Sequence, residues 1–266
     1  MATLYVGSSQ DYQTIQDAVN AASDGDTIIV KGSEYALTNE KVSITKAVTV
    51  QAEGDVTVDQ FGIGSGTAKP QDIVIDGFTI KPTVCAIEAA RTCGIYQNGT
   101  NLNTLTVTNC NFDLTEPAAE TIGYGIHLDL NFSGTEKVTV DGCTFTGDDA
   151  MVTSAMRASY QSSIEFTNNT VSNISGNAVQ MSLTGPTWGY NGDAAVTFEG
   201  NTFTDIGGCA IYAADIANNN VFFNVTENDF TNINVNGGST YWGAIRFGAG
   251  SVNGLTVNHD TSKLFI

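Results

Sequence analysis

The segments IEFTNNTV (residues 164–171) and VTFEGNTF (residues 196–203) follow one eight-residue pattern. In both, positions one, three and eight are apolar and position six is Asn. Five further segments share the pattern, the last of them incomplete, and consecutive copies start 26 to 33 residues apart: IVIDGFTI (73–80), LTVTNCNF (105–112), VTVDGCTF (138–145), FNVTENDF (223–230) and LTVNHD (255–260). Such a recurrence is typical of a solenoid whose stacked coils share one core.

The pattern also predicts a bend inside each copy. Apolar residues at positions one and three indicate a strand with one buried face. Position eight is apolar as well, although simple alternation would turn it outward, so the chain must bend at positions five and six. Position five accordingly holds residues that tolerate a left-handed backbone: Gly77, Asn109, Gly142, Asn168 and Gly200.

Position six predicts a ladder of stacked side chains. It holds Asn169, Asn201, Asn228 and Asp260 in successive coils, where stacked amides can hydrogen-bond along the solenoid. Two earlier coils have Cys110 and Cys143 at this position. We expect both to be buried free thiols, because stacked residues point the same way rather than at each other.

A second short strand recurs between these copies: GIYQ (94–97), GIHL (125–128), AMVT (150–153), AVQM (178–181), AIYA (210–213) and AIRF (244–247). Together with the two halves of the bent segment, it gives three strands per coil. The sequence therefore predicts an all-β fold, a single-stranded right-handed parallel β-helix. A propeller would need four antiparallel strands per blade, and a leucine-rich repeat would need its L-x-x-L-x-L spacing.

The N-terminal region predicts a cap for this helix. Thr14 is a candidate N-cap, and Ile15, Val19 and Ala22 form an apolar stripe at helical spacing, which ends before residues 23–26. We expect one domain over 1–266, with the cap and entry strand at 1–32 and the coils at 33–266. No comparable cap follows residue 255, which favours further domains in a longer parent protein.

Charge and cysteine content limit the partners. The net charge is −18, from 10 Lys+Arg and 28 Asp+Glu, which argues against nucleic acid binding. No apolar stretch reaches the roughly 18 residues of a membrane span, so no membrane insertion is expected. Five cysteines without a CxxC pair, and two histidines, argue against zinc and against a disulfide framework. The Asn- and Thr-rich surface favours an extracellular or cell-surface protein, although residues 1–6 do not form a signal peptide.

The entry region resembles that of a known superfamily. YQTIQDAV (12–19), followed by GDTIIV (25–30) and Gly32, resembles the entry module of the pectin lyase-like β-helix superfamily, and the coils resemble its generic repeats. The superfamily includes pectate lyases, polygalacturonases, pectin methylesterases, phage tailspikes, adhesins and non-catalytic polysaccharide binders. The resemblance implies that a substrate groove lies on the sheet of AIY-type strands, between flanking loops.

Outward residues of that sheet are candidate carbohydrate ligands. If Ile95, Ile126, Met151, Val179, Ile211 and Ile245 face inward, the residues that follow them face out. The polar and aromatic members of that outward row suit sugar stacking and hydroxyl recognition; Val152 is the exception. With the tryptophans of the flanking loops, the predicted carbohydrate-binding residues are Tyr96, His127, Gln180, Trp188, Tyr212, Trp242 and Arg246. The alternative is an ordinary solvated sheet face.

The sequence contains fewer candidate catalytic residues than candidate carbohydrate-binding residues. GDDAM (147–151) resembles the GDD motif of polygalacturonases, whose hydrolysis uses two carboxyl groups. The coil before has Tyr124 where that family has Asp, and the coil after has no His at 175–178, which favours turn residues at Asp148 and Asp149. A lyase would need a Ca²⁺ site, for which Asp129 and Asp149 are candidates, and a base, for which Arg157 or Arg246 is a candidate. Ca²⁺ is thus the one cofactor considered.

Three functions remain open. The first is a non-catalytic or weakly catalytic extracellular module for polysaccharide binding or adhesion to a cell-surface glycan. The second is a polysaccharide lyase or glycoside hydrolase that acts on acidic, pectin-like glycans. The third is a structural stalk or fibre segment.

Overall fold

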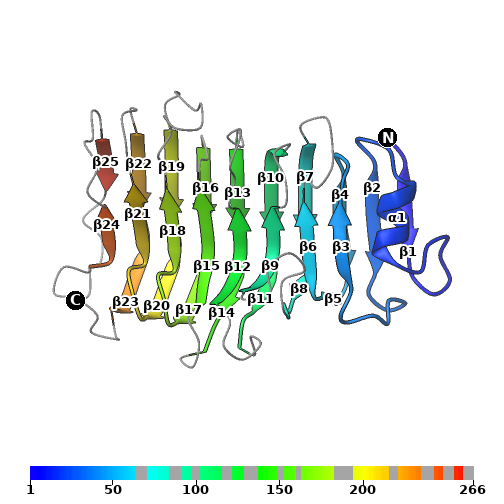
Figure 1. The fold of residues 1–266 in the computed structure, drawn as a ribbon, viewed down its shortest axis with the longest axis horizontal. Helices are drawn as coiled ribbons and strands as arrows, with labels where there is room; N and C mark the ends of the chain where they lie inside the picture. Colours follow the sequence, from blue (N-terminus) through cyan, green and yellow to red (C-terminus); the bar gives the residue numbers. More distant parts are fainter. Residues whose placement is uncertain are drawn as a thin grey trace.

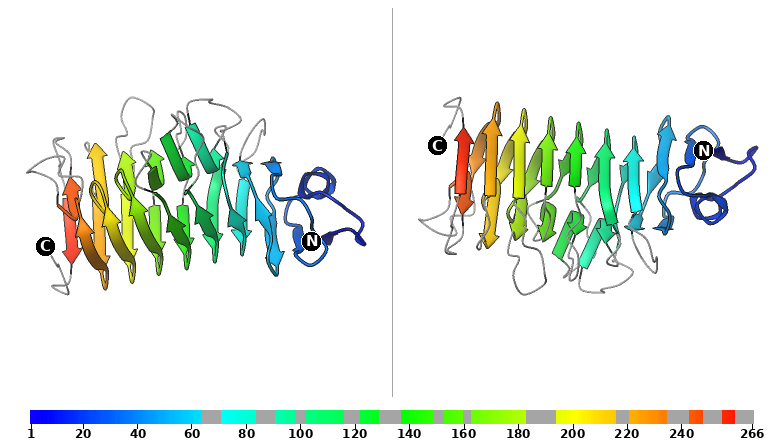
Figure 2. Two further views of the ribbon diagram at one scale, coloured as in Figure 1. Left: turned by 90° about the horizontal axis from the view of Figure 1, so that it is seen from below. Right: turned by 90° about the horizontal axis from the view of Figure 1, so that it is seen from above.

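The chain folds as a parallel β-helix, whose coils follow one another along the long axis (Figure 1). The computed structural model describes residues 1–63, 71–83, 91–97, 102–115, 122–128, 137–148, 153–159, 163–182, 194–215, 221–234, 243–247 and 255–259. Every strand pairing in this part of the chain is parallel, and the strands form three sheets, as predicted. Views from below and above show α1 at one end of the stack and β24 and β25 at the other (Figure 2).

Sheet 1 contains the first half of each bent segment and begins with the entry strands. Its strands, in spatial order, are β1 (Thr3–Val6), β2 (Thr27–Lys31), β4 (Thr49–Glu53), β7 (Gln71–Asp76), β10 (Leu102–Thr108), β13 (Lys137–Asp141), β16 (Ser163–Thr167), β19 (Ala194–Glu199), β22 (Val221–Thr226) and β25 (Leu255–His259).

Sheet 2 contains the second half of each bent segment. Its strands are β5 (Thr57–Val58), β8 (Thr79–Ile80), β11 (Asn111–Asp113), β14 (Thr144–Thr146), β17 (Thr170–Ile174), β20 (Thr202–Ile206) and β23 (Asp229–Ile233).

Sheet 3 contains the AIY-type strands that the sequence singled out. Its strands are β3 (Lys41–Ile44), β6 (Gln60–Ile63), β9 (Arg91–Gln97), β12 (Ile122–Leu128), β15 (Thr153–Ser159), β18 (Val179–Ser182), β21 (Ile211–Asp215) and β24 (Ile245–Phe247).

The core is a set of apolar columns that run through the coils. Position one of the repeat pairs in register from β7 to β22, and position eight does so from β8 to β23. The predicted register of the seventh copy is wrong by two residues, because Val257 rather than Leu255 pairs with Phe223. Where neighbouring coils have Phe in a column, the rings stack, with centroids 4.4 Å apart for Phe112 and Phe145 and 5.4 Å apart for Phe203 and Phe230. No single coil could bury these rings alone, so each coil depends on its neighbours.

The bend between sheets 1 and 2 has the predicted backbone and the predicted ladder. Asn109 and Asn168 have φ of 53° and 55°, and Gly77, Gly142 and Gly200 also have positive φ. In the ladder, Asn169 N–H donates to Asn201 Oδ1 at 2.9 Å, and Asn201 N–H donates to Asn228 Oδ1 at 3.0 Å. The three amides are buried, so these bonds satisfy groups that water cannot reach.

Cys110 and Cys143 continue this ladder as buried free thiols, as predicted. Cys143 N–H donates to Asn169 Oδ1 at 2.8 Å, and Cys110 N–H points to Cys143 Sγ at 3.4 Å. The hydrogen bond with the neighbouring Cys110, together with burial, raises the pKa of the Cys143 thiol well above its usual range. Both cysteines therefore fill structural positions in the ladder.

The N-terminal cap is the short helix α1 (Ile15–Ala21), with Thr14 as its N-cap, as predicted. Thr14 Oγ1 accepts from Asp17 N–H at 3.0 Å. The carboxylate of Glu40 also caps the helix, because it accepts from the N–H groups of Ile15 and Gln16 at 3.1 and 2.8 Å. In the described part of the chain, no helix has the length and apolar character of a membrane span.

Removal of one ladder amide should destabilise the whole stack. Asn201→Ala would leave Asn169 N–H and Phe166 O without the side chain that they contact, and Asn228 Oδ1 would keep only the backbone N–H of residue 201. We expect a loss of about 3 kcal/mol in the free energy of unfolding, measured by urea titration. Asn111→Ala, at an exposed position on β11, is the control and should cost less than about 0.5 kcal/mol. Equal losses in the two variants would contradict a structural role for the ladder.

The cap should make stability depend on pH through Asp26. The N–H groups of Ala2 and Ser23 donate to its carboxylate at 2.5 and 2.8 Å and hold the pKa of Asp26 below its usual value. A lowered pKa stabilises the folded state above the unfolded pKa of about 3.9, and this stabilisation is lost as pH falls through the lowered value.

Asp26→Asn should therefore unfold at a lower temperature than the wild type at pH 7, and the difference should shrink in acid. The exposed Asp11→Asn is the control and should show no such convergence. A difference that stays constant down to the acid unfolding limit would contradict the role given to Asp26.

Candidate functional site

The outer face of sheet 3 holds one row of side chains on six consecutive strands. The row is defined by the pairings Tyr96↔His127, His127↔Arg157, Arg157↔Gln180, Gln180↔Tyr212 and Tyr212↔Arg246. We call these six residues the outer row. The residues that precede them on β9 to β21 are buried in the main core, so alternation turns the row to the other face.

Five of the six members were predicted, and the sixth corrects the prediction. The sequence placed a strand at 150–153, with Met151 inward and Val152 outward. The structure begins β15 at Thr153, pairs Met156 with Ile126, and places Arg157 in the row. The reason is a repeated dipeptide, since Ala-Met occurs at 150–151 and again at 155–156, and both frames satisfy the apolar alternation. Arg157 thereby moves from a loosely placed candidate to the centre of the row.

A second set of outer side chains lies beside the row: Cys93, Tyr124 and Ser154, which pair with one another on β9, β12 and β15. Gly125 is the reason that Tyr124 faces outward. A Cβ at Gly125 would lie 2.7 Å from the Phe145 ring and 2.6 Å from Ala155 O, so this position faces the core at close range. Gly125 and Ile126 both face inward, which leaves Tyr124 and His127 together on the outer face.

Five of these side chains form what we call the outer cluster: Cys93, Tyr96, Tyr124, His127 and Arg157. The rings of Tyr124 and His127 stack, with centroids 4.7 Å apart and planes 18° apart. Arg157 Nη1 lies 3.4 Å from Tyr124 Oη, and Cys93 Sγ lies 3.9 Å from His127 Nδ1. The cluster thus brings a phenol, an imidazole, a guanidinium and a thiol into contact.

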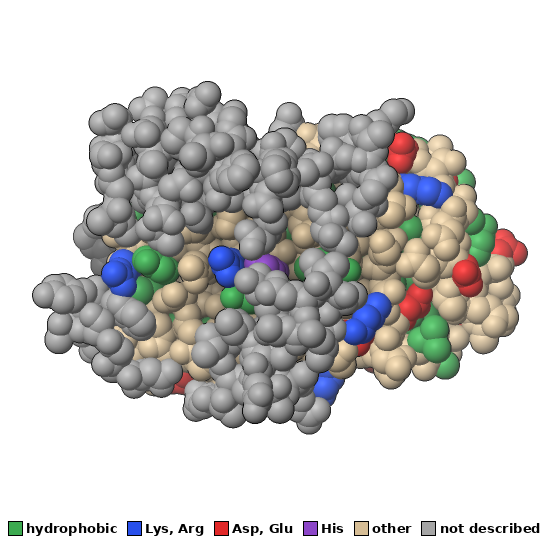
Figure 3. Space-filling model, in the orientation of Figure 1, with side chains coloured by type: hydrophobic (Ala, Val, Ile, Leu, Met, Phe, Trp, Pro, Cys, Tyr) green, Lys and Arg blue, Asp and Glu red, His purple; other side chains and the backbone are tan. Residues whose placement is uncertain are grey.

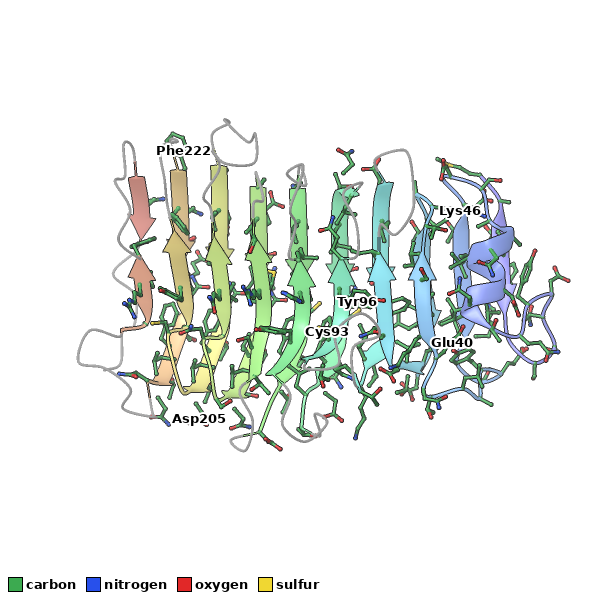
Figure 4. All side chains as sticks on the ribbon, in the orientation of Figure 1. Glu40, Lys46, Cys93, Tyr96, Asp205 and Phe222 are labelled. Carbon is green, nitrogen blue, oxygen red and sulfur yellow. The ribbon has the colours of Figure 1, made fainter. Side chains whose placement is uncertain are left out.

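Apart from the half-buried Arg157, the outer cluster is buried without being part of the main core. Cys93, Tyr96 and Tyr124 form a separate buried group, and His127 is only 6% exposed. Figure 4 labels Cys93 and Tyr96 on β9. Figure 3 shows a histidine beside a basic side chain near the middle of this face. Sequence analysis missed Tyr124 and Cys93 as members, although the glycine that follows each of them signals a break in alternation.

The C-terminal half of the outer row is more open. Gln180, Tyr212 and Arg246 are partly exposed, and the Arg246 guanidinium lies over the Tyr212 ring, 5.1 Å from its centroid. Such a pair presents an aromatic face and a cation together. Cys209 is buried just before β21, and burial raises the pKa of its thiol above the usual value, although Arg246 opposes the shift.

The structure does not describe four of the other predicted site residues. Trp188, Trp242, Asp129 and Asp149 lie outside the described residues. Asp148 is half-buried before β15, and Tyr124 pairs with Ser154 rather than with a residue of the GDD string. Arg157 and Arg246 are three strands apart, or about 14 Å at about 4.8 Å per strand, so they cannot act on one bond together.

A metal centre does not emerge from the described part of the chain. Within it, no group of three or more His, Cys, Asp or Glu side chains could hold an ion. Both candidate Ca²⁺ ligands, Asp129 and Asp149, lie beyond that part, so the Ca²⁺ site stays a prediction.

Comparison with known proteins agrees with the fold. The sequence model of the family described as "Right handed beta helix region" matches residues 26–224. The chain belongs to that family. A solved structure, that of the PL6 family alginate lyase AlyGC, superposes with a TM-score of 0.65 at 14% sequence identity, over 99% of this chain and 40% of that chain.

These comparisons confirm the fold, and with it the predicted pectin lyase-like β-helix. The chain spans about two fifths of the length of that lyase, and so low an identity carries the fold alone. No curated protein matches the sequence.

The packing of Tyr96, at one end of the outer row, should depend on the absence of a side chain at Gly62 beneath its ring. A Cβ at Gly62 would lie 2.6 Å from Tyr96 Oη, so Gly62→Ala must displace this buried ring. We expect the substitution to cost about 1–3 kcal/mol in the wild type and much less in a Tyr96→Ala background, measured by a double-mutant cycle on urea unfolding. An equal cost in both backgrounds would mean that Tyr96 does not lie over Gly62.

Proposed function

We propose that this protein binds polysaccharide along the outer row of sheet 3, as an extracellular or cell-surface module. The observation that carries the proposal is the row itself, six polar or aromatic side chains in register on consecutive coils. The partly exposed members, from Arg157 to Arg246, span about 14 Å at about 4.8 Å per strand, which suits an extended chain of sugars. The similarity in fold to a β-helical alginate lyase supports a polysaccharide as the ligand.

The chemistry of the row favours acidic glycans. Two of the three arginines of this acidic protein are in it, Arg157 and Arg246, and the row contains no carboxylate. Lysines of the described part lie elsewhere, for example in ion pairs of Lys31 with Glu53 and of Lys137 with Glu165 on sheet 1. Guanidinium groups bind carboxylates with two parallel hydrogen bonds, and exposed aromatic rings stack on sugars. Repulsion from the distant acidic surface is screened beyond about 8 Å at physiological salt.

A binding assay tests the proposal. Wild-type protein is titrated with acidic and neutral glycans, among them alginate, polygalacturonate and xyloglucan, with and without Ca²⁺, in a calorimeter. We expect binding to at least one acidic glycan, and Tyr212→Ala with Arg246→Ala should weaken it about tenfold, equivalent to about 1.4 kcal/mol. If the predicted loop tryptophans also contact the sugar, Trp188→Ala with Trp242→Ala should weaken it as well.

A matched control is present on sheet 1. There Lys31 lies over the ring of Tyr5, 5.2 Å from its centroid, which reproduces the cation–ring pair of the outer row on another face. Tyr5→Ala with Lys31→Ala should leave glycan binding unchanged. An equal loss in both double variants, or no binding to any glycan, would overturn the proposal, and the second result would favour a stalk.

A further inference from the structure

The outer face of sheet 2 carries two rows of hydroxyl side chains, away from the glycan site proposed on sheet 3. Positions seven and nine of the repeat face outward on this sheet, on either side of the buried apolar position eight. On three consecutive strands, β14, β17 and β20, both positions hold a hydroxyl. We call these six side chains the hydroxyl array: Thr144, Thr146, Thr170, Ser172, Thr202 and Thr204.

The array is a regular lattice. Thr144 pairs with Thr170 and Thr170 with Thr202, and the second row pairs in the same way through Ser172, without a shift in register. Neighbours along the stack are therefore about 4.8 Å apart, and the two rows are about 6.6 Å apart, twice the rise per residue of a strand. The flanking strands β11 and β23 have acidic residues at matching positions, so the uncharged lattice spans β14 to β20.

The hydroxyls of the array are available to an external partner. Within the described part of the chain, none of the six bonds to another protein group, whereas the backbone groups of their strands pair with neighbouring coils. Sheet 1 differs, because Thr108 and Thr167 donate to aspartates of the preceding coil at 2.7 and 2.6 Å. A hydroxyl that the fold does not use keeps its donor and its acceptor sites for a ligand.

The composition of the array argues against sugars, ions and proteins as ligands. It has no aromatic ring on which a sugar could stack and no charge that could hold an ion. Its six side chains span roughly 10 Å by 7 Å, far less than the roughly 800 Å² that each partner buries in a stable protein complex. The array offers only hydroxyl and methyl groups at fixed spacings, which suits a ligand that is itself a lattice.

Ice has spacings close to those of the array. Water oxygens that are hydrogen-bonded at about 2.75 Å in a tetrahedral network place second neighbours about 4.5 Å apart, and the hexagonal network repeats after about 7.3 Å along its axis. With the middle strand in register, each of the six hydroxyl oxygens lies within about 0.5 Å of a lattice position. We infer that the outer face of sheet 2 is an ice-binding surface.

The adsorption gains its strength from contacts made at the same time. One hydroxyl gains little from ice, because it exchanges a hydrogen bond with liquid water for another with solid water. A crystal presents all six partners in fixed positions, so each contact after the first costs little further entropy. The threonine methyl groups add apolar surface that leaves liquid water. An adsorbed protein blocks the addition of water at that patch, so the crystal resumes growth only at a lower temperature.

Growth of a single ice crystal in a droplet of the full-length protein tests the inference. The measured quantity is the gap between the melting temperature of the crystal and the temperature at which it resumes growth. A dissolved solute that does not adsorb lowers both temperatures equally and opens no gap. We expect a gap for the wild type and, at the same concentration, a gap about tenfold smaller for Thr170→Tyr, because its ring would keep the neighbouring hydroxyls from engaging the lattice together.

Thr197→Tyr on β19 is the matched control. It makes the same change on the outer face of sheet 1, where Thr197 lies between Glu165 and Asn224. Its gap should equal that of the wild type. Tyr is a good strand former, so both variants should fold, and Thr202→Tyr replaces Thr170→Tyr if circular dichroism shows that variant to be unfolded.

The outcomes separate this inference from the proposed function. Absence of a gap for the wild type overturns the inference, as does an equal loss in Thr170→Tyr and Thr197→Tyr. A wild-type gap in Thr170→Tyr overturns the assignment to sheet 2. None of these results bears on glycan binding, which calorimetry tests on residues of sheet 3.

Discussion

Register between neighbouring coils is the constraint on which this structure depends. Every strand pairs in parallel with its equivalent one coil away, and a buried amide ladder connects the bends from Asn169 to Asn228. A slip of one residue would turn each apolar column outward and leave the ladder amides buried without partners. Because both penalties recur in every coil, one register is strongly preferred. The positions of the outward-facing side chains are therefore fixed as well, because these side chains alternate along each strand with inward-facing residues whose register is fixed.

The same constraint explains how a site can form on a sheet face without a cleft cut into the fold. Residues far apart in the chain become neighbours at one strand spacing, as Tyr96, His127 and Arg157 do. The one departure from regularity is at Gly125, where two consecutive residues face the core and two outer side chains meet on one strand. A regular solenoid therefore presents a repeating row, and a local break in alternation adds a contact between two outer side chains of one strand.

Sequence analysis was accurate where the physics is periodic. The apolar columns, the left-handed bends and the Asn ladder all repeat, so each copy supported the assignment of the others. It was wrong at β15, where a second Ala-Met dipeptide offered an equally apolar frame, and it missed Tyr124, which faces outward only because Gly125 packs against Phe145. Glu40 was missed as a helix cap for a similar reason, because its partners are 24 and 25 residues away in the chain. Each of these contacts belongs to one coil and does not repeat, so a periodic sequence pattern cannot predict it.

The contrast between the two ends of the outer row has a physical meaning. At the C-terminal end, Arg246 and Tyr212 are partly exposed, so they keep their hydration until a ligand replaces it, and this suits reversible binding. Near the other end, Tyr124 and His127 are already out of water and held by Cys93 and Arg157 before any ligand arrives. Tyr124 and His127 are therefore ordered by contacts within the protein, whereas Tyr212 and Arg246 keep contact with water. The outer row thus divides into a half that solvent reaches and a half that is ordered by contacts within the protein.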